Sequence, residues 1–353
     1  MEQVQRPLVS LCMIVRDEEM FLKSCLNSVG PFAEEIVVVD TGSADRTIDI
    51  AKEAGAQVHS FNWNGSFAEA RNYGLERATG QWILYMDADE QLEVHDVHRW
   101  LEALHDPSAR ALAIRIVNYY GKDEVKESDA YLLSQIRLFR NDLGLTFEGA
   151  IHEQLNLREK LPGLKGVSVL PAEIHHYGYI DSIADAKGKQ MRNAELLEAE
   201  QEKPDYHPWV DYHVANLYYQ DRGYKSAVEW VNRAIKRFLE RKEVPPSMLY
   251  KLKYEALLKA GYTDDALLGI DKAIRMYPDY VDLHYCKGRL LYSARRYAEA
   301  SESFQTCLAL GDGHPFYLVQ RGAGSFLAEK YAERCRSIIA DASAGTNDGG
   351  ERA

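Results

Sequence analysis

Hydrophobic and polar residues alternate in blocks along the first third of the chain. Short apolar runs are separated by stretches whose apolar residues recur every three or four positions. The runs predict buried strands, and the stretches predict amphipathic helices. The predicted strands are 8–15, 35–39, 57–59 and 82–86, and the predicted helices lie near 21–26, 48–54 and 67–79. This alternation is typical of a Rossmann-like, mostly parallel α/β sheet with helices on both faces.

Two changes of pattern divide the rest of the chain. From Ala111 to about Tyr179 the predicted strands, among them 111–117 and 134–139, are separated by turn residues. Beyond Asp185 nearly every segment has helical periodicity, and the last residues are rich in Gly and Asp. We therefore expect an α/β domain over residues 1–180, an all-α domain over 181–342 and a disordered tail over 343–353.

The helical half repeats itself every 34 residues. The matching columns pair Tyr254 with Gly288, Ala266 with Ala300, Ile270 with Phe304 and Ala273 with Cys307. A period of this length with small, aromatic and proline positions is typical of tetratricopeptide repeats, which stack helix pairs into a solenoid. A third copy around Ala227 is offset by an insertion near 244–246, and a generic helical bundle is the alternative.

Composition narrows the classes of partner and compartment. The net charge of −12 argues against general nucleic-acid binding, which needs a basic surface. No apolar stretch approaches the ~20 residues of a membrane helix, so we expect no integral membrane association. The five cysteines form no CxxC pair, and the N-terminal segment lacks a signal-peptide pattern. Both features favour a reducing, cytoplasmic location.

The strongest chemical signal is Asp87-Ala88-Asp89, which follows the predicted strand 82–86. Asp40 ends another predicted strand, and ligands of parallel sheets bind beyond the carboxyl ends of the strands. Two neighbouring carboxylates repel unless a cation lies between them. A hard cation such as Mg²⁺ or Mn²⁺ that bridges to a diphosphate would satisfy both carboxylates. A solvated turn is the alternative interpretation of this motif.

Four motifs in order resemble the family 2 glycosyltransferases, which have the GT-A fold. They are Val15-Arg16-Asp17-Glu18-Glu19, Val39-Asp40-Thr41-Gly42-Ser43, Ala70-Arg71-Asn72 and Met86-Asp87-Ala88-Asp89, within a resemblance that covers residues 7–179. The resemblance implies that Asp40 and Arg16 contact the nucleobase and that Arg71 neutralises the diphosphate. It also implies that Asp87 faces the ribose or the metal, that Ala88 binds the nucleotide-sugar and that Asp89 binds the metal. Asp17 stands where the family usually has Asn.

Two downstream segments resemble a narrower subgroup, the sublancin-type peptide glycosyltransferases, in which tetratricopeptide repeats follow the catalytic domain. The segments are 147–153, which ends in His152-Glu153, and 174–179, which contains His175-His176. The resemblance implies that His176 is a further metal ligand beside Asp89. His175 should then point away, because neighbouring strand residues face opposite sides of a sheet. For the catalytic base we expect Glu153 first, His152 second and Glu148 third. The alternative is that these three residues only order a loop over the donor.

These observations predict a metal-dependent inverting glycosyltransferase that moves a sugar from a UDP-sugar, such as UDP-glucose, to a Cys or Ser of a peptide or protein acceptor. A bacteriocin precursor peptide is the acceptor that the subgroup implies. The repeats would dock the acceptor or form a homodimer. A glycosyltransferase acting on a cell-surface polysaccharide or lipid-linked saccharide is one alternative. A repeat-based adaptor without activity is the alternative from another class.

Overall fold

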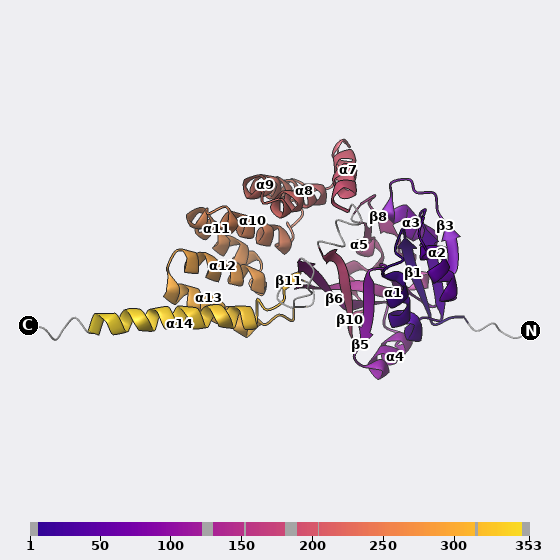
Figure 1. Ribbon diagram of the computed structural model, residues 1–353, viewed down its shortest axis with the longest axis horizontal. Coiled ribbons are helices and arrows are strands. Elements are labelled where there is room, and N and C mark those ends of the chain that lie inside the picture. The colour runs from indigo at the N-terminus through magenta and orange to yellow at the C-terminus, as the bar shows by residue number, and fades with distance from the viewer. Residues whose placement is uncertain are drawn as a thin grey trace, which may run out of the picture. The chain divides into compact units, whose positions relative to one another are not determined.

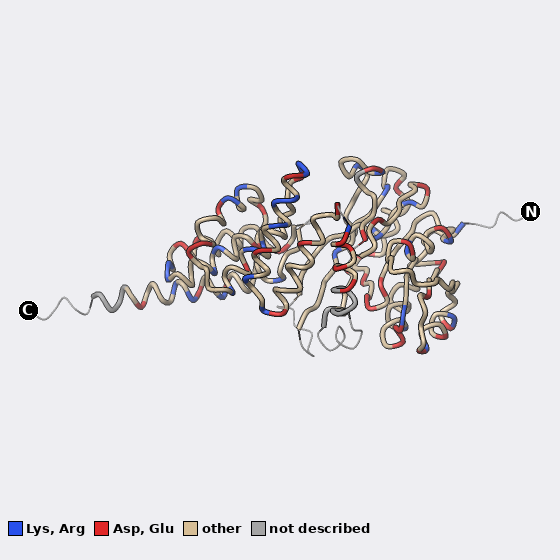
Figure 2. Tube along the Cα trace, turned by 90° about the horizontal axis from the view of Figure 1, so that it is seen from above, with Lys and Arg blue, Asp and Glu red and all other residues tan. Residues whose placement is uncertain are grey.

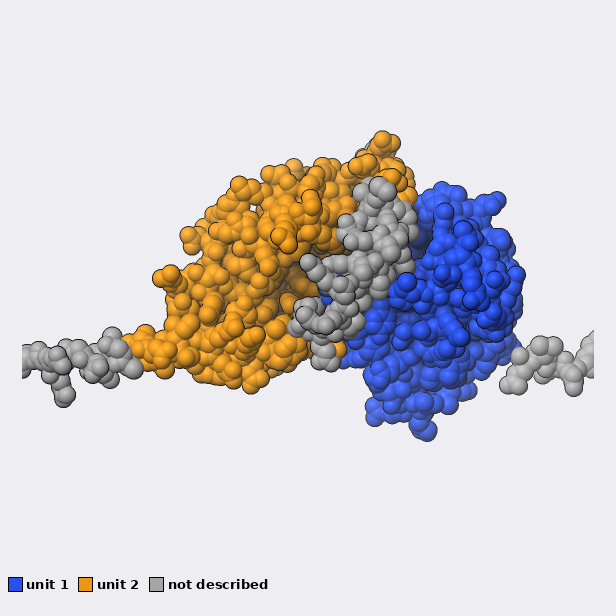
Figure 3. All heavy atoms as spheres, in the orientation of Figure 1, with its two compact units in different colours: residues 1–125, 133–188 blue, residues 126–132, 189–353 orange. Residues whose placement is uncertain are grey.

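The computed structural model describes residues 6–121, 130–151, 153–180, 189–203, 205–314 and 317–347. The chain divides into two compact units, which Figure 3 colours separately. Unit 1 comprises residues 1–125 and 133–188, and unit 2 comprises residues 126–132 and 189–353. The division near 188 follows the predicted boundary at 180 by a few residues. The short segment 126–132 groups with the helical unit, which the local sequence pattern does not predict.

Unit 1 is the predicted α/β fold. The strands at 9–15, 35–40, 57–60 and 82–85 occur where the sequence predicts them, because β-branched and aromatic residues there pack within a sheet, whereas the strand at 90–94 was not predicted. Helix α3 ends at Leu75, four residues before the predicted end, since residues 76–79 turn back towards the sheet. The elements are β1 (Val9–Val15), α1 (Leu22–Val29), β2 (Glu35–Asp40), α2 (Thr47–Glu53), β3 (Gln57–Ser60), α3 (Phe67–Leu75), β4 (Trp82–Tyr85), β5 (Glu90–Val94), α4 (Val97–His105), β6 (Ala111–Gly121), β7 (Ala130–Arg140), β8 (Phe147–Glu148), β9 (Gln154–Leu155), α5 (Leu157–Lys160) and β10 (Val167–Ile180).

One curled sheet organises this unit, with strand order β3-β2-β1-β4-β7-β6-β10-β5. Strands β3, β2, β1 and β4 are parallel, as are β6 and β10. Strand β7 is antiparallel to β4, and β5 is antiparallel to β10. The mostly parallel GT-A-like sheet predicted from the sequence is therefore confirmed, with β4, β5 and β10 carrying the Asp-x-Asp segment and the His-His pair to one region.

Alternating residues of β1 build the two apolar layers of unit 1. Leu11 and Met13 pack on one face with α1 and α4, whose Leu22 and Trp100 are fully buried. Cys12 faces the opposite layer, where Leu75 of α3 packs against the sheet. Figure 1 shows the helices flanking the strands in this way. Because β1 is buried on both faces, it forms a rigid central support for the loops at its carboxyl end.

Unit 2 contains the predicted helical repeat. Helices of one pair begin 34 positions before those of the next, at residues 247 and 281 and at residues 263 and 297. Ala227, Ala266 and Ala300, which the repeat aligns, are all fully buried. The elements are α7 (Lys189–Gln201), α8 (Trp209–Gln220), α9 (Tyr224–Glu240), α10 (Ser247–Lys259), α11 (Thr263–Met276), α12 (Val281–Ser293), α13 (Tyr297–Leu310), β11 (Val319–Gln320) and α14 (Phe326–Asn347).

In two successive repeats, a large residue of one helix packs against a small residue of the other helix of the pair. Which helix carries the large residue differs between these repeats. A Cβ atom on Gly288 would lie 2.6 Å from the ring of Phe304, so only glycine fits there. Tyr254, its counterpart one repeat earlier, instead packs on Gly269. Helix α14 continues to Asn347, into the segment predicted as a tail, and residues 348–353 lie outside the described part. Backbone hydrogen bonding thus carries the helix through Ser and Gly residues that composition assigned to a tail.

Charged side chains are distributed over both units. Acidic and basic residues are interspersed along the described residues of both units, as Figure 2 shows, in a chain of net charge −12. Among the described helices, none is both long and apolar enough to cross a bilayer. All five cysteines are buried free thiols.

Candidate functional site

The predicted site begins at the carboxyl ends of three neighbouring parallel strands. Strand β1 lies between β2 and β4, and Val15 at its end pairs with Asp40 at the end of β2. Asp87 follows β4 by two residues. The sheet therefore brings the Asp40 segment and the Asp-x-Asp segment to the same edge, as expected for a ligand site of this fold.

Asp40 is a buried carboxylate held by backbone amides. Its oxygens accept hydrogen bonds from the N–H groups of Gly42 and Ser43, each at 3.1 Å. Gly42 has φ +109, a conformation that glycine adopts readily, and this turn aims the amides at Asp40. Arg16 is more than half exposed, with its Nε 3.9 Å from Asp17. The structure thus buries Asp40 at the end of its strand and leaves Arg16 largely exposed.

Asp17 joins the loop after β1 to the loop after β2. Its amide donates to Ser43 Oγ at 3.0 Å, and its Oδ1 accepts from the Ala44 amide at 2.8 Å. The residue has φ +53, which Asn and Asp tolerate better than most side chains. The departure from the family's usual Asn therefore preserves a side chain that can accept from the neighbouring loop.

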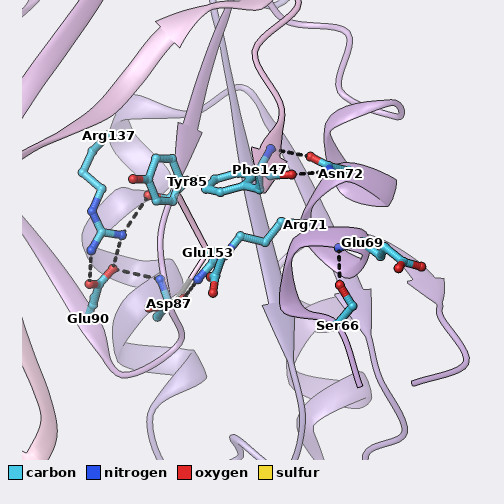
Figure 4. Close-up of polar contacts among 10 residues, drawn as sticks. All are labelled: Ser66, Glu69, Arg71, Asn72, Tyr85, Asp87, Glu90, Arg137, Phe147 and Glu153. Atoms are coloured by element: carbon cyan, nitrogen blue, oxygen red, sulfur yellow. Dashed lines mark hydrogen bonds and ion pairs between the residues drawn. The ribbon is translucent and has the colours of Figure 1, made fainter. Parts of the chain in front are cut away.

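Arg71 lies at the centre of the polar cluster in Figure 4. Its NH2 group donates to Asp87 Oδ1 at 2.7 Å, and its Nε donates to Glu153 Oε1 at 2.5 Å. The rings of Tyr85 and Phe147 lie 5.6 and 5.4 Å from the guanidinium carbon. Apolar rings around an ion pair exclude water, which strengthens the attraction between the opposite charges.

Helix α3 fixes the position of Arg71. Ser66 caps the helix by accepting from the Glu69 amide at 3.2 Å. Asn72 forms two hydrogen bonds with the backbone of Phe147, donating to its carbonyl at 3.0 Å and accepting from its amide at 2.8 Å. The Ala-Arg-Asn motif thus has two parts: Arg71 faces the carboxylates, and Asn72 fastens the β8–β9 connection that carries Glu153.

The charges around Asp87 set its protonation. Burial raises the pKa of this carboxyl, but the neighbouring charges of Arg71 and Arg137 outweigh burial and lower the pKa to about 2. Asp87 is therefore ionised throughout the physiological range. Arg71 is held as a cation by the same pairing, because Asp87 and Glu153 together outweigh burial and raise the pKa of the guanidinium.

His176 lies beside Asp89, as predicted. Its Nε2 is 3.4 Å from Asp89 Oδ1, and its Nδ1 is 2.9 Å from Asn118 Oδ1. Burial lowers the pKa of His176, while the hydrogen bond and charge of Asp89 outweigh burial and raise it. His175 lies on the other side of β10, where its ring contacts Tyr119 and Glu93. The expected opposite orientation of the two histidines is confirmed.

The chemistry of this pair fits a divalent cation. An imidazole that donates Nδ1–H to an amide oxygen presents its Nε2 lone pair for coordination, a common arrangement of metal-binding histidines. Asp89 adds a carboxylate oxygen and is 5% exposed. Among the described residues no group of three or more His, Cys, Asp and Glu side chains could hold a metal. A cation here would need additional oxygen ligands, which a diphosphate can supply.

Of the three residues considered for the base, Glu153 and Glu148 lie in different surroundings. Glu153 is 13% exposed in its side chain and paired with Arg71. Glu148 is exposed on β8. His152 lies outside the described residues. Ala88, between the two aspartates, is 3% exposed.

Sequence reasoning missed Arg137 and Glu90. Arg137 donates from NH2 to Glu90 Oε1 at 2.7 Å and from NH1 to Glu90 Oε2 at 3.1 Å, and both side chains are buried. The signal available in the sequence was a single arginine between Ile136 and Leu138 in the predicted strand 134–139. Burial of such a residue requires an opposite charge, and Glu90 directly after Asp-x-Asp supplies it.

Comparison with known proteins identifies the domain that contains this cluster. The model of glycosyl transferase family 2 matches residues 10–163. A TPR repeat-containing protein of Synechococcus elongatus is 32% identical over 269 residues, which are 75% of this chain and 64% of that protein.

Other relatives are named as glycosyltransferases. The SPbeta prophage-derived glycosyltransferase SunS of Bacillus subtilis is 28% identical over 82% of this chain and 68% of its own length. An uncharacterized glycosyltransferase of Rickettsia typhi is 27% identical over 48% of this chain and 60% of its own length. This chain thus spans about two thirds of the relatives that also cover its repeats. It contains a region over residues 10–163 that matches glycosyl transferase family 2, and tetratricopeptide-type helical repeats follow that region.

Proposed function

We propose that this protein is a metal-dependent inverting glycosyltransferase that uses a UDP-sugar donor. The observation that carries the proposal is the cluster of Asp40, Arg71, Asp87, Asp89 and His176 at one edge of the sheet. Each member has the chemistry of one part of the donor: acceptors for the base and ribose, a cation for the diphosphate, and two metal ligands. A family 2 domain over residues 10–163 supports this assignment.

Asp40 is proposed to accept a hydrogen bond from the uracil ring, with Arg16 on the open side of the base. Asp87 and the backbone at Ala88 would face the ribose and the diphosphate. Arg71 would approach the phosphates, where a planar guanidinium can donate two parallel hydrogen bonds. Since Arg71 already pairs with Asp87, donor binding would add an anion to an existing ion pair rather than bury a lone cation.

The metal is proposed to be Mg²⁺ or Mn²⁺, held by Asp89 and His176. When bound, the cation neutralises the diphosphate and so stabilises UDP as it leaves. Asn118 would keep the His176 ring oriented through its contact with Nδ1. The donor set of one carboxylate and one imidazole suits Mn²⁺ at least as well as Mg²⁺, because imidazole is a softer ligand than oxygen.

Glu153 is proposed as the base, followed by His152 and Glu148. As the acceptor sulfur or oxygen forms its bond to the anomeric carbon, its proton passes to the base and the bond to UDP breaks. Arg71 holds the Glu153 carboxylate at 2.5 Å. Approach of the diphosphate to Arg71 would loosen this pair and leave Glu153 free to take the proton.

The acceptor is proposed to be a peptide or protein Cys or Ser. The likeness to glycosyltransferase SunS, which extends over 82% of this chain, supports it. The repeats would hold the acceptor and raise its effective concentration. Tyr218 and Tyr262, 41% and 37% exposed, are the tyrosines of α8 and of the α10–α11 turn that could contact such a chain. A cytoplasmic location and a homodimer through the repeats belong to the same proposal.

Calorimetry tests the donor half of this proposal. UDP should bind to the chain in Mn²⁺, and binding should weaken in EDTA and in Asp89→Ala. Equal UDP affinity under all three conditions would remove the metal from the site.

Intact-mass spectrometry tests the acceptor half. Cys- and Ser-containing peptides incubated with UDP-glucose and the chain should gain the mass of one hexose. Substitution of Tyr218 and Tyr262 by Ala should raise the acceptor KM and leave UDP release in the absence of peptide unchanged. If acceptor KM and oligomeric state both stay as in the wild type, these tyrosines do not dock the acceptor.

A further inference from the structure

A second buried ion pair lies directly behind the Asp-x-Asp turn. Arg137 of β7 and Glu90 of β5 form two hydrogen bonds, at 2.7 and 3.1 Å, and their side chains are 7% and 0% exposed. The guanidinium carbon lies 4.8 Å from the centre of the Tyr85 ring, and Arg137 NH1 is 3.4 Å from the Tyr85 carbonyl. Figure 4 shows this pair next to Asp87 and apart from Glu153.

Glu90 closes the turn that contains both aspartates. Its Oε2 accepts from the Asp87 amide at 2.8 Å, and its own amide donates to the Asp87 carbonyl at 3.1 Å. The two bonds link positions 87 and 90 in both directions. Since Arg137 holds both oxygens of Glu90, the acceptor for the Asp87 amide cannot rotate away without breaking the ion pair.

Stability alone is a weak reason for this arrangement. Moving two charges out of water is costly, and well-packed apolar residues of similar volume often stabilise a core as well as a buried ion pair does. The Nε of Arg137 is also buried with no hydrogen-bond partner, which adds a further cost. Since buried charge alone gives little reason for the pair, its hydrogen bond to the turn points to a role in geometry.

We propose that Arg137 and Glu90 are positioning residues, which lock the Asp87-Ala88-Asp89 turn so that Asp87 faces Arg71 and Asp89 faces His176. The inference rests on the proposed function, because the turn matters only if Asp87 and Asp89 handle a donor diphosphate and its cation. Displacement of a reacting group by about 1 Å can lower a rate about 100-fold. Loss of the lock should therefore reduce turnover in a chain that remains folded.

The test removes both charges together, so that no unpaired charge is left buried. Glu90→Met with Arg137→Met should unfold within a few degrees of the wild type, since both partners leave at once. The kcat for UDP release from UDP-glucose in Mn²⁺ should fall by roughly 10- to 100-fold. The half-saturating Mn²⁺ concentration should rise. Glu90→Gln with Arg137→Met keeps an acceptor for the Asp87 amide and should recover part of the lost kcat.

Arg289 and Glu255 provide a matched control. They form another largely buried Arg–Glu pair, at 2.6 Å, within unit 2. Glu255→Met with Arg289→Met should leave UDP release in the absence of an acceptor unchanged. If the Glu90/Arg137 double variant does not fold, Arg137→Lys takes its place, because a lysine cannot reach both oxygens in the same geometry. It should lower kcat by roughly 5-fold or more.

The outcomes separate this inference from the proposed function. If the wild type releases UDP and the double variant has the same kcat and the same Mn²⁺ dependence, the positioning role is overturned and the proposed function is not. If only Arg137→Lys folds, an unchanged kcat and Mn²⁺ dependence in that variant would overturn the positioning role. Failure of the wild type to release UDP from any UDP-sugar would overturn the proposed function, and the positioning role with it.

Discussion

Replacing Arg71 with methionine tests whether the cluster is held together by charge. The guanidinium lies between Asp87 Oδ1 at 2.7 Å and Glu153 Oε1 at 2.5 Å. Methionine has a similar length and can keep the contacts with the Tyr85 and Phe147 rings. The substitution therefore removes the positive charge and leaves both carboxylates without the hydrogen bonds that Arg71 donates.

The exposure of the three side chains sets the expected magnitude. Removing one partner of a fully buried ion pair costs about 3–5 kcal/mol of unfolding free energy. Arg71 and Glu153 are 10% and 13% exposed, whereas Asp87 is 35% exposed, so water screens part of the effect. We expect Arg71→Met to lower the unfolding free energy at pH 7 by about 2–4 kcal/mol.

The pH dependence of this loss has a definite sign. In the wild type the pKa of Asp87 is lowered to about 2, so its stabilising contribution is present above the unfolded-state value near 4 and disappears as the pH falls towards 2. Without Arg71 the pKa of Asp87 rises, and the carboxylate takes up a proton at a higher pH. The difference between wild type and variant should be largest at pH 7 and shrink towards pH 4.

Urea unfolding measures this difference. Tryptophans occur in both units, so fluorescence would report on both at once. Hydrogen exchange of β4 peptides is therefore used to follow unit 1. Arg99→Met is the control, since Arg99 is 72% exposed beside Asp96 and should change the unfolding free energy by less than about 1 kcal/mol. An Arg71→Met chain as stable as the wild type, or a deficit that does not vary between pH 7 and pH 4, would refute the reasoning.

Three further predictions follow from single positions. Asp40→Ala should raise the Kd for UDP about 10- to 100-fold, through loss of a charge-assisted hydrogen bond of about 1.5–3 kcal/mol; unchanged affinity in calorimetry would remove Asp40 from the site. His176→Gln should raise the half-saturating Mn²⁺ concentration for UDP binding about 10- to 100-fold, whereas an unaltered Mn²⁺ titration would exclude it as a ligand. Gly288→Ala should lower the unfolding free energy by about 1–3 kcal/mol, because its Cβ would lie 2.6 Å from Phe304; an unchanged Tm would contradict that packing.

The strands that carry Asp40 and Asp87 could be predicted from the local pattern of apolar residues. Strands β1, β2 and β4 are apolar runs buried in the sheet, so the residue pattern alone assigns Asp40 and Asp87 to strand ends. The pairing of His176 with Asp89 was anticipated only through the family resemblance. It depends on the antiparallel register of β10 and β5, in which His176 lies opposite Glu90.

Long-range charge pairing accounts for what local pattern could not predict. Nothing near Arg137 in the sequence indicates that its partner is Glu90, 47 positions earlier. Likewise Asn72 has the appearance of a helix surface residue until Phe147, 75 positions away, is brought beside it. The segment 126–132 groups with unit 2 because Tyr131 and Leu132 pair with Gln320 and Val319 of β11, a contact without local periodicity.

The central claim is that the strand-end cluster is a metal-dependent UDP-sugar site. Its most direct test is UDP release from a panel of UDP-sugars by the 353-residue chain in Mn²⁺, run beside Asp89→Ala and an EDTA control. The account predicts release above the uncatalysed rate for at least one donor, and its loss in EDTA and in an Asp89→Ala chain that unfolds at the wild-type temperature. Absence of release with every donor, or full release by Asp89→Ala, would contradict it.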